Sequence, residues 1–153
     1  MPEHHATLKR APLRILLVED DDGDAKAVTR AFSRAGIGNP IHRVCDGIAG
    51  LCYLRGDGWA RPAGPILLLV DLHMPRMGGI EFVRALRADP SLRPLTAFIL
   101  TTSDLDTDRN SAFDVNVAGY ILKQNAGEEF LRLVSMLDEY WHLVEVPPLR
   151  TVS

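Results

Sequence analysis

The stretch that decides the fold is ILLVEDDDGD, residues 15–24. Four apolar residues run directly into five carboxylates within six positions: Glu19, Asp20, Asp21, Asp22 and Asp24. Such an apolar run is typical of a strand buried on both faces of a parallel sheet. Carboxylates at a few ångströms repel by about 4 kcal/mol per pair at an effective dielectric near 20. The cluster therefore needs a cation, a shared proton or a lysine to be stable.

The composition fits one domain with one core. The chain has 153 residues, of which 46% are hydrophobic and 24% charged, enough for a single core. The net charge is only -3 and there is no basic block, so the electrostatic footprint of a nucleic-acid-binding protein is missing. No apolar run approaches the ~20 residues of a membrane helix. We predict a cytoplasmic protein with neither nucleic acid nor membrane as partner.

Strand-length apolar runs alternate with amphipathic segments along the whole chain. The predicted strands are 13–18, 40–44, 66–70, 96–100 and 118–122. The predicted helices are 24–36, 47–56, 79–89, 108–116 and 128–141. Strict alternation implies right-handed βαβ units and a parallel sheet with helices on both faces. The predicted fold class is therefore α/β, a flavodoxin-like (βα)5 doubly wound five-stranded parallel sheet in a single domain.

Polar side chains follow four of these strands, at the edge where such sheets bind ligands. They are Glu19 and Asp20 after the first strand, Asp71 after the third, Thr101 and Thr102 after the fourth, and Lys123 after the fifth. Three acids, two hydroxyls and one lysine are not a set that core packing selects. Hard oxygen ligands in an open site suit Mg²⁺, which commonly bridges to a phosphoryl oxygen.

A simpler explanation exists for some of the acids in the opening stretch, residues 15–24. Acids after a strand can open the next helix, where the helix dipole favours negative charge. We accept this explanation for Asp22 and Asp24, and Asp21 stays undecided. Helix opening does not explain a carboxylate directly after the third strand, Asp71, with Lys123 opposite it.

Four blocks of sequence resemble the signature of one family. ILLVEDD, LLLVDLHMPRMGG, FILTTS and GYILK are similar, in order and spacing, to the blocks of response-regulator receiver domains of two-component systems. The resemblance runs from about Leu13 to Tyr140. It implies a phosphorelay protein rather than a conventional enzyme, with Asp71 accepting a phosphoryl group from a histidine on a sensor kinase. Self-catalysed phosphorylation and dephosphorylation are the chemistry open to such a protein.

The resemblance also implies a metal site. Asp20 and Asp71 would bind Mg²⁺ directly, Glu19 would act through water, and the backbone carbonyl of His73 would complete the protein ligands.

The remaining roles concern the phosphoryl group. Thr101 resembles the hydroxyl that hydrogen-bonds this group, Lys123 resembles its ion-pair partner, and Thr102 lies at the position that can narrow its entry. Thr101 and Tyr120 match the switch positions, where added negative charge pulls the hydroxyl inward and the aromatic ring follows.

The chain departs from the family pattern at four positions. Gly78-Gly79 replaces a common Asp-Gly, so a glycine takes the helix N-cap. Gln124 replaces a proline that is commonly preceded by a cis peptide, and we predict a trans bond because cis would cost ~3 kcal/mol here. His73 and Thr102 replace residues that border the phosphoryl site, which bears on the lifetime of the phosphorylated state.

The two ends are predicted to differ. Residues 1–12 are a polar, disordered leader, 13–141 the receiver domain, and 142–153 an apolar C-terminal tail. The tail with the last helix is either the arm of a homodimer, which we favour, or an intramolecular lid. This tail, with YLRGDG at 53–58, resembles the stand-alone receivers that partner phytochrome-type (bacteriophytochrome) histidine kinases.

Three alternative functions fit the sequence less well. A phosphatase of the haloacid dehalogenase type also forms a phospho-aspartate with Mg²⁺, but it needs a second acid two residues after the nucleophile, where this chain has His73. A flavodoxin-like FMN binder would cradle phosphate in a Gly/Ser/Thr-rich loop, whereas five carboxylates here would repel it. A receiver with a DNA-binding output is not expected, since the ~12 residues that flank the domain at each end are too few for a helix-turn-helix.

Overall fold

Strands and helices alternate along the chain in the computed structural model, which describes residues 13–34, 36, 38–56, 64–123, 132, 135, 136 and 139. The strands are β1 (Arg14–Val18), β2 (Ile41–Val44), β3 (Ile66–Val70), β4 (Thr96–Thr101) and β5 (Gly119–Leu122). The helices are α2 (Asp22–Arg34), α3 (Gly47–Arg55), α4 (Gly79–Ala88) and α5 (Asp106–Asp114). All five predicted strands and four of the five predicted helices are confirmed. Most of the fifth helix, 128–141, and all of the leader and the tail lie outside the described residues.

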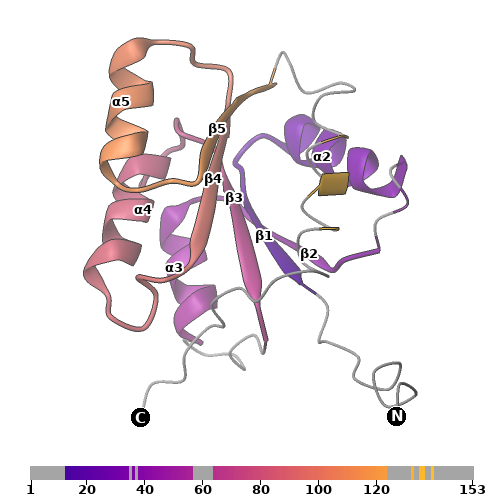
Figure 1. Cartoon of the computed structure of the whole chain (residues 1–153), viewed down its shortest axis with the longest axis horizontal. Coiled ribbons are helices and arrows are strands. Elements are labelled where there is room, and N and C mark those ends of the chain that lie inside the picture. Colours follow the sequence, from indigo (N-terminus) through magenta and orange to yellow (C-terminus); the bar gives the residue numbers. More distant parts are fainter. Residues whose placement is uncertain are drawn as a thin grey trace.

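All five strands are parallel and belong to one sheet of order β2-β1-β3-β4-β5 (Figure 1). The chain steps outward from β1 to β2, then returns to the other side of β1 to form β3, so the direction of winding reverses between β1 and β3. In open sheets the ligand binds outside the carboxyl ends of the strands at this reversal. Val18 pairs with Val70, which leaves the residues that follow the two strands side by side.

The helices cover both faces of the sheet. Helix α2 lies on one face and α3, α4 and α5 on the other (Figure 1). Ala25, Val28 and Phe32 of α2 recur at helical spacing and pack with β1 and β3 in one buried cluster. Phe82 and Leu86 of α4 belong to the larger cluster on the opposite face. Strand β3 is buried along its whole length, as its unbroken apolar sequence predicts.

Local signals begin and end these helices where the sequence indicates. Asp46 caps α3 by accepting the Ala49 N–H at 2.8 Å, and Gly56 ends it in the left-handed conformation at φ 76°. Gly78 caps α4 without a side-chain hydrogen bond, as predicted. No peptide bond among the described residues is cis; the bond before Gln124 lies outside them. Within the same residues, none of the helices is long and apolar enough to cross a membrane.

Candidate functional site

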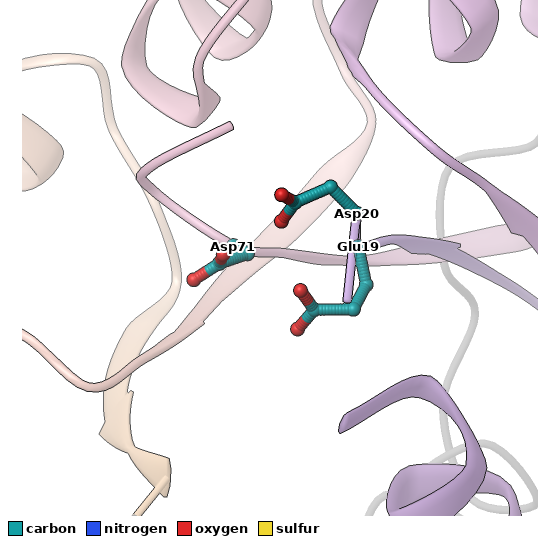
Figure 2. A group of neighbouring side chains, drawn as sticks. All are labelled: Glu19, Asp20 and Asp71. Carbon is teal, nitrogen blue, oxygen red and sulfur yellow. The ribbon is translucent and has the colours of Figure 1, made fainter. Parts of the chain in front are cut away.

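Three carboxylates meet at the carboxyl ends of β1 and β3. Glu19 and Asp20 follow β1, and Asp71 follows β3. One carboxylate oxygen from each lies within 4.8 Å of the others (Figure 2). Glu19 and Asp71 are buried, at 1% and 8% exposure, whereas Asp20 is exposed. The predicted clustering of these acids is therefore confirmed, and the sheet register is its cause.

This donor set fits a divalent cation. Carboxylate oxygens are the ligands that Mg²⁺ and similar hard cations prefer. One exposed acid beside two buried ones leaves the site open on one side. The close spacing of three acids is costly without positive charge, so a bound cation would relieve a repulsion that the fold itself imposes.

Lys123 supplies positive charge from the fifth strand. It directly follows β5, and its ammonium lies 2.5 Å from Glu19 Oε1 and 3.6 Å from Asp71 Oδ1. The Lys123 side chain is 14% exposed, so little water screens these contacts. The sequence prediction that Lys123 faces the acids is thus confirmed.

Burial sets the ionisation of the cluster. It raises the pKa of Glu19 to about 7, although the Lys123 ammonium opposes this. It also raises the pKa of Asp71, against the Lys123 charge and the Thr101 hydroxyl. Burial acts to lower the pKa of Lys123, but its acidic partners, led by Asp24, outweigh burial and raise it. Near neutral pH, Glu19 can therefore retain a proton, and this proton and the Lys123 ammonium both reduce the repulsion between the acids.

Asp24 has a role that the sequence did not reveal. Its Oδ2 accepts a hydrogen bond from Lys123 Nζ at 2.7 Å. The expectation that Asp24 only opens the helix is therefore wrong, although it does lie in the first turn of α2. The sequence around Asp24 contains no information about a partner 99 positions away, so no local signal could have identified this contact.

The other two acids of the opening stretch have different partners, and the expectation that Asp22 only opens the helix is also wrong. Asp21, which the sequence left undecided, accepts the Asp24 N–H at 2.7 Å and so caps α2. Asp22 pairs with Arg43 of β2 at 2.7 Å. The same guanidinium donates to the Glu19 carbonyl at 2.8 Å. Arg43, which the sequence analysis missed, therefore fixes the backbone at the acid cluster.

The hydroxyl side of the site is formed by the end of β4. Thr101 is buried at 1% exposure and lowers the pKa of Asp71 by hydrogen bonding, so its hydroxyl faces Asp71. Thr102 is exposed. Tyr120 of β5 is half-buried, and its hydroxyl donates to the Ser103 carbonyl at 2.6 Å. The candidate switch residue thus contacts the loop directly after Thr101.

A second polar network lies beside this loop. His73 Nε2 lies 3.0 Å from Asp108 Oδ2, and the same oxygen accepts the Ser103 hydroxyl at 2.5 Å. The sequence analysis assigned the backbone of His73 to the metal site and placed its side chain beside the phosphoryl site, but it missed Asp108 and Ser103. The network joins the loop after β3 to the first turn of α5.

One glycine is required by the geometry of the site. The Gly79 N–H donates to the Leu72 carbonyl at 2.8 Å, which draws the start of α4 against the residues after β3. A Cβ at Gly79 would lie 2.3 Å from the Asp71 carbonyl oxygen, closer than any side chain allows. Glycine at position 79 therefore permits the close approach of α4 to the backbone of Asp71.

The chain matches known proteins over most of its length. Residues 15–135 match the family model of the response regulator receiver domain. A probable methanogenesis regulatory protein, FilR2 of Methanothrix harundinacea, is 35% identical over 130 residues, which cover 85% of this chain and 84% of FilR2. Response regulator Rcp1 of Synechocystis is 27% identical over 131 residues, covering 85% of this chain and 89% of Rcp1.

Solved structures agree with the sequence matches. The phosphorylated cyanobacterial phytochrome response regulator RcpA aligns with a TM-score of 0.75 and 28% identity, covering 90% of this chain and 99% of RcpA. The Mn²⁺-bound form of Rcp1 aligns with a TM-score of 0.73 and 26% identity, covering 89% of this chain and 99% of Rcp1.

Proposed function

This chain belongs to the response regulator receiver domain family, and on that premise we propose that Asp71 accepts a phosphoryl group from a sensor histidine kinase. The observation that carries the proposal is the position of Asp71. Its carboxylate lies beside two other acids and 3.6 Å from the Lys123 ammonium, where β3 ends. Family membership disfavours the alternatives, a phosphatase of the haloacid dehalogenase type or an FMN binder.

The proposed transfer is a displacement at phosphorus. An oxygen of Asp71 attacks, the new O–P bond forms as the P–N bond of the phosphohistidine breaks, and the electron pair returns to the donor imidazole. A carboxylate attacks a dianionic phosphoryl group poorly, so positioning and charge neutralisation carry the catalysis. Lys123 neutralises the phosphoryl oxygens, and Thr101 donates a hydrogen bond to them.

A divalent cation completes the proposal. Asp20 and Asp71 would hold Mg²⁺ directly, Glu19 through water and His73 through its backbone carbonyl. When bound, Mg²⁺ supplies positive charge that offsets the repulsion between the carboxylate and the incoming phosphoryl oxygens. Thr102 is assigned to the entry of the phosphoryl group. Thr101 and Tyr120 would form the switch, with the hydroxyl of Tyr120 leaving the Ser103 carbonyl as the loop moves.

The direct test is labelling by a kinase. Purified protein is incubated with candidate sensor kinases, Mg²⁺ and labelled ATP, beside the variant Asp71→Asn, which keeps the shape but lacks the nucleophilic charge. We expect a hydroxylamine-sensitive acyl-phosphate label on the wild type and no such label on Asp71→Asn. Label retained by Asp71→Asn would make the assignment of Asp71 wrong.

The metal site has its own test. Asp20→Asn removes an exposed ligand, so millimolar Mg²⁺ should raise the melting temperature of the wild type but not of the variant. The metal-free variant should melt above the metal-free wild type, since it carries less repulsion. A wild-type melting temperature indifferent to Mg²⁺ would rule out the metal site.

We further propose a kinase of the phytochrome type as partner. RcpA, described as a cyanobacterial phytochrome response regulator, is similar over nearly its whole length. A cytoplasmic location, where such a kinase would have access to ATP, is part of this proposal. The homodimer through the last helix and tail also stays a prediction, because those residues lie outside the described part of the chain. Light scattering of the full chain and of a truncation after residue 138 tests it: only the full chain should dimerise.

A further inference from the structure

The Lys123 ammonium is held by two acids that do not accept the phosphoryl group. It lies 2.5 Å from Glu19 Oε1 and 2.7 Å from Asp24 Oδ2. The distance to Asp24 is that of a charge-assisted hydrogen bond, and the distance to Glu19 is shorter still. The distance to Asp71 Oδ1 is 3.6 Å, which is too long for a hydrogen bond. Asp71 therefore interacts with the charge of the ammonium but accepts no hydrogen bond from it.

Asp24 is built into a fixed position. It lies in the first turn of α2, where its N–H is bound by the Asp21 carboxylate at 2.7 Å. Its side chain is 44% exposed, and it does not belong to the group of acids that could hold a metal ion. Its contact in the site is therefore with Lys123, and it can be changed without removing a proposed metal ligand.

From this geometry we propose that Asp24 is a positioning residue that restrains Lys123 away from Asp71 and slows phosphorylation. The inference rests on the proposed role of Asp71 as phospho-acceptor. An ammonium has three N–H donors, and Glu19 and Asp24 each engage one. To bind oxygens of a phosphoryl group on Asp71, the ammonium has to lengthen or release its bond to Asp24. The free-energy cost of breaking this bond raises the barrier to phosphorylation. A variant without the Asp24 carboxylate does not have that cost.

The test compares two variants that each remove one charge from the first turn of α2. Asp24→Asn removes the restraint, whereas Asp22→Asn removes the acid that pairs with Arg43. Asp24→Glu serves as the conservative variant, able to rebuild the ion pair. All are phosphorylated by a small donor such as acetyl phosphate with Mg²⁺, and Asp71→Asn gives the background.

A second readout needs neither metal nor phosphate. The chain contains three lysines, at positions 9, 26 and 123, so the ammonium signal of Lys123 can be assigned by nitrogen NMR. In the metal-free wild type its protons should exchange slowly with water. Asp24→Asn should accelerate this exchange, while Asp22→Asn should leave it unchanged. This readout reports the contact itself and not the reaction.

The expected result is a two- to tenfold faster initial phosphorylation of Asp24→Asn. This change in rate corresponds to about 0.4 to 1.4 kcal/mol, in keeping with the modest energy of a half-exposed ion pair. Asp22→Asn and Asp24→Glu should stay near the wild-type rate. An unchanged or slower rate in Asp24→Asn, or an equal gain in Asp22→Asn, would overturn the inference while leaving the role of Asp71 intact. Absence of label on the wild type would overturn the proposed function and this inference with it.

Discussion

Two polar groups of similar geometry lie at the same edge of the sheet but in different surroundings. The lysine cluster comprises Glu19, Asp24, Asp71 and Lys123, and the histidine network comprises His73, Ser103, Asp108 and Tyr120. Contacts of 2.5 to 3.0 Å occur in both. The Lys123 side chain is 14% exposed, whereas that of His73 is 67% exposed.

The difference in burial separates their electrostatics. The pKa of Asp108 is lowered by the Ser103 hydroxyl and by His73, the ordinary effect of a partner in water. The pKa of Glu19 is raised to about 7 by burial, despite a lysine at 2.5 Å. The distance between two charged groups therefore does not determine how much their pairing stabilises the protein. The free-energy cost of removing the charges from water has to be set against their attraction. The predictions below test this contrast, beginning with the largest effect.

Lys123→Met should cause the greatest loss of stability. It leaves Glu19 and Asp71 buried without their cation, and breaking one side of a buried pair is costly. Because these acids can take up a proton, we expect a loss of about 2 to 4 kcal/mol in the metal-free protein at pH 8. The measurement is denaturant unfolding. Lys26→Met, at an exposed position of α2, is the control, and its change should stay within about 0.5 kcal/mol. Equal losses in the two variants would contradict the contrast.

The pH dependence of stability is the next largest effect. Since the pKa of Glu19 is about 7 when folded and 4.5 ordinarily, the folded protein binds a proton that the unfolded chain releases. The unfolding free energy of the metal-free protein should thus fall by about 2.5 kcal/mol as the pH rises from 4.5 to 7. Asp71, whose pKa is also raised, acts in the same direction.

Glu19→Gln isolates this contribution, since it should flatten the decline. His42 works the other way, because burial lowers its pKa. The unfolded chain therefore binds more proton at His42 than the folded protein does, and the contribution of His42 to stability increases as the pH rises. His42→Gln should therefore steepen the decline. Unfolding curves at several pH values decide the matter, and a decline in Glu19→Gln as steep as in the wild type would show that Glu19 is not responsible for it.

The fold could be predicted almost wholly from sequence because its signals are local. The unbroken apolar run of β3 predicts burial on both faces, and helical spacing in α2 predicts a face toward the sheet. Alternation then implies parallel strands, which place Glu19 beside Asp71. The clustering of Glu19, Asp71 and Lys123 follows from position at strand ends.

Side-chain partners across the sheet could not be predicted in the same way. The Lys123 contact with Asp24 and the His73 contact with Asp108 join residues 99 and 35 positions apart. Each depends on where a helix begins relative to a strand and on the rotamers chosen there. A carboxylate in the first turn of a helix has the same sequence pattern whether it faces water, as an ordinary helix-opening acid, or a lysine.

Within the histidine network, Tyr120→Phe should have the larger effect. It deletes a hydroxyl that donates to the Ser103 carbonyl at 2.6 Å. A single hydrogen bond of this kind contributes about 1 kcal/mol to stability, so the loss should fall well below that of Lys123→Met. Thermal or denaturant unfolding measures it. Tyr53→Phe is the matched control, since the Tyr53 ring stacks on His42. A loss of several kcal/mol in Tyr120→Phe would show that the histidine network contributes to stability as much as the buried lysine cluster does.

His73→Ala should have the smallest effect on stability. Most of the side chain is in water, and an exposed ion pair contributes about 0 to 1 kcal/mol. Asp108 does not become an isolated charge in this variant, because the Ser103 hydroxyl still donates to it at 2.5 Å. We therefore expect a change within about 0.5 kcal/mol, and 1 M salt should abolish it by screening. The same salt should leave most of the Lys123→Met loss in place, because water and ions reach that cluster poorly. Denaturant unfolding of both variants at low and high salt makes the comparison. A salt-resistant loss in His73→Ala as large as that of Lys123→Met would mean that burial does not separate the two groups.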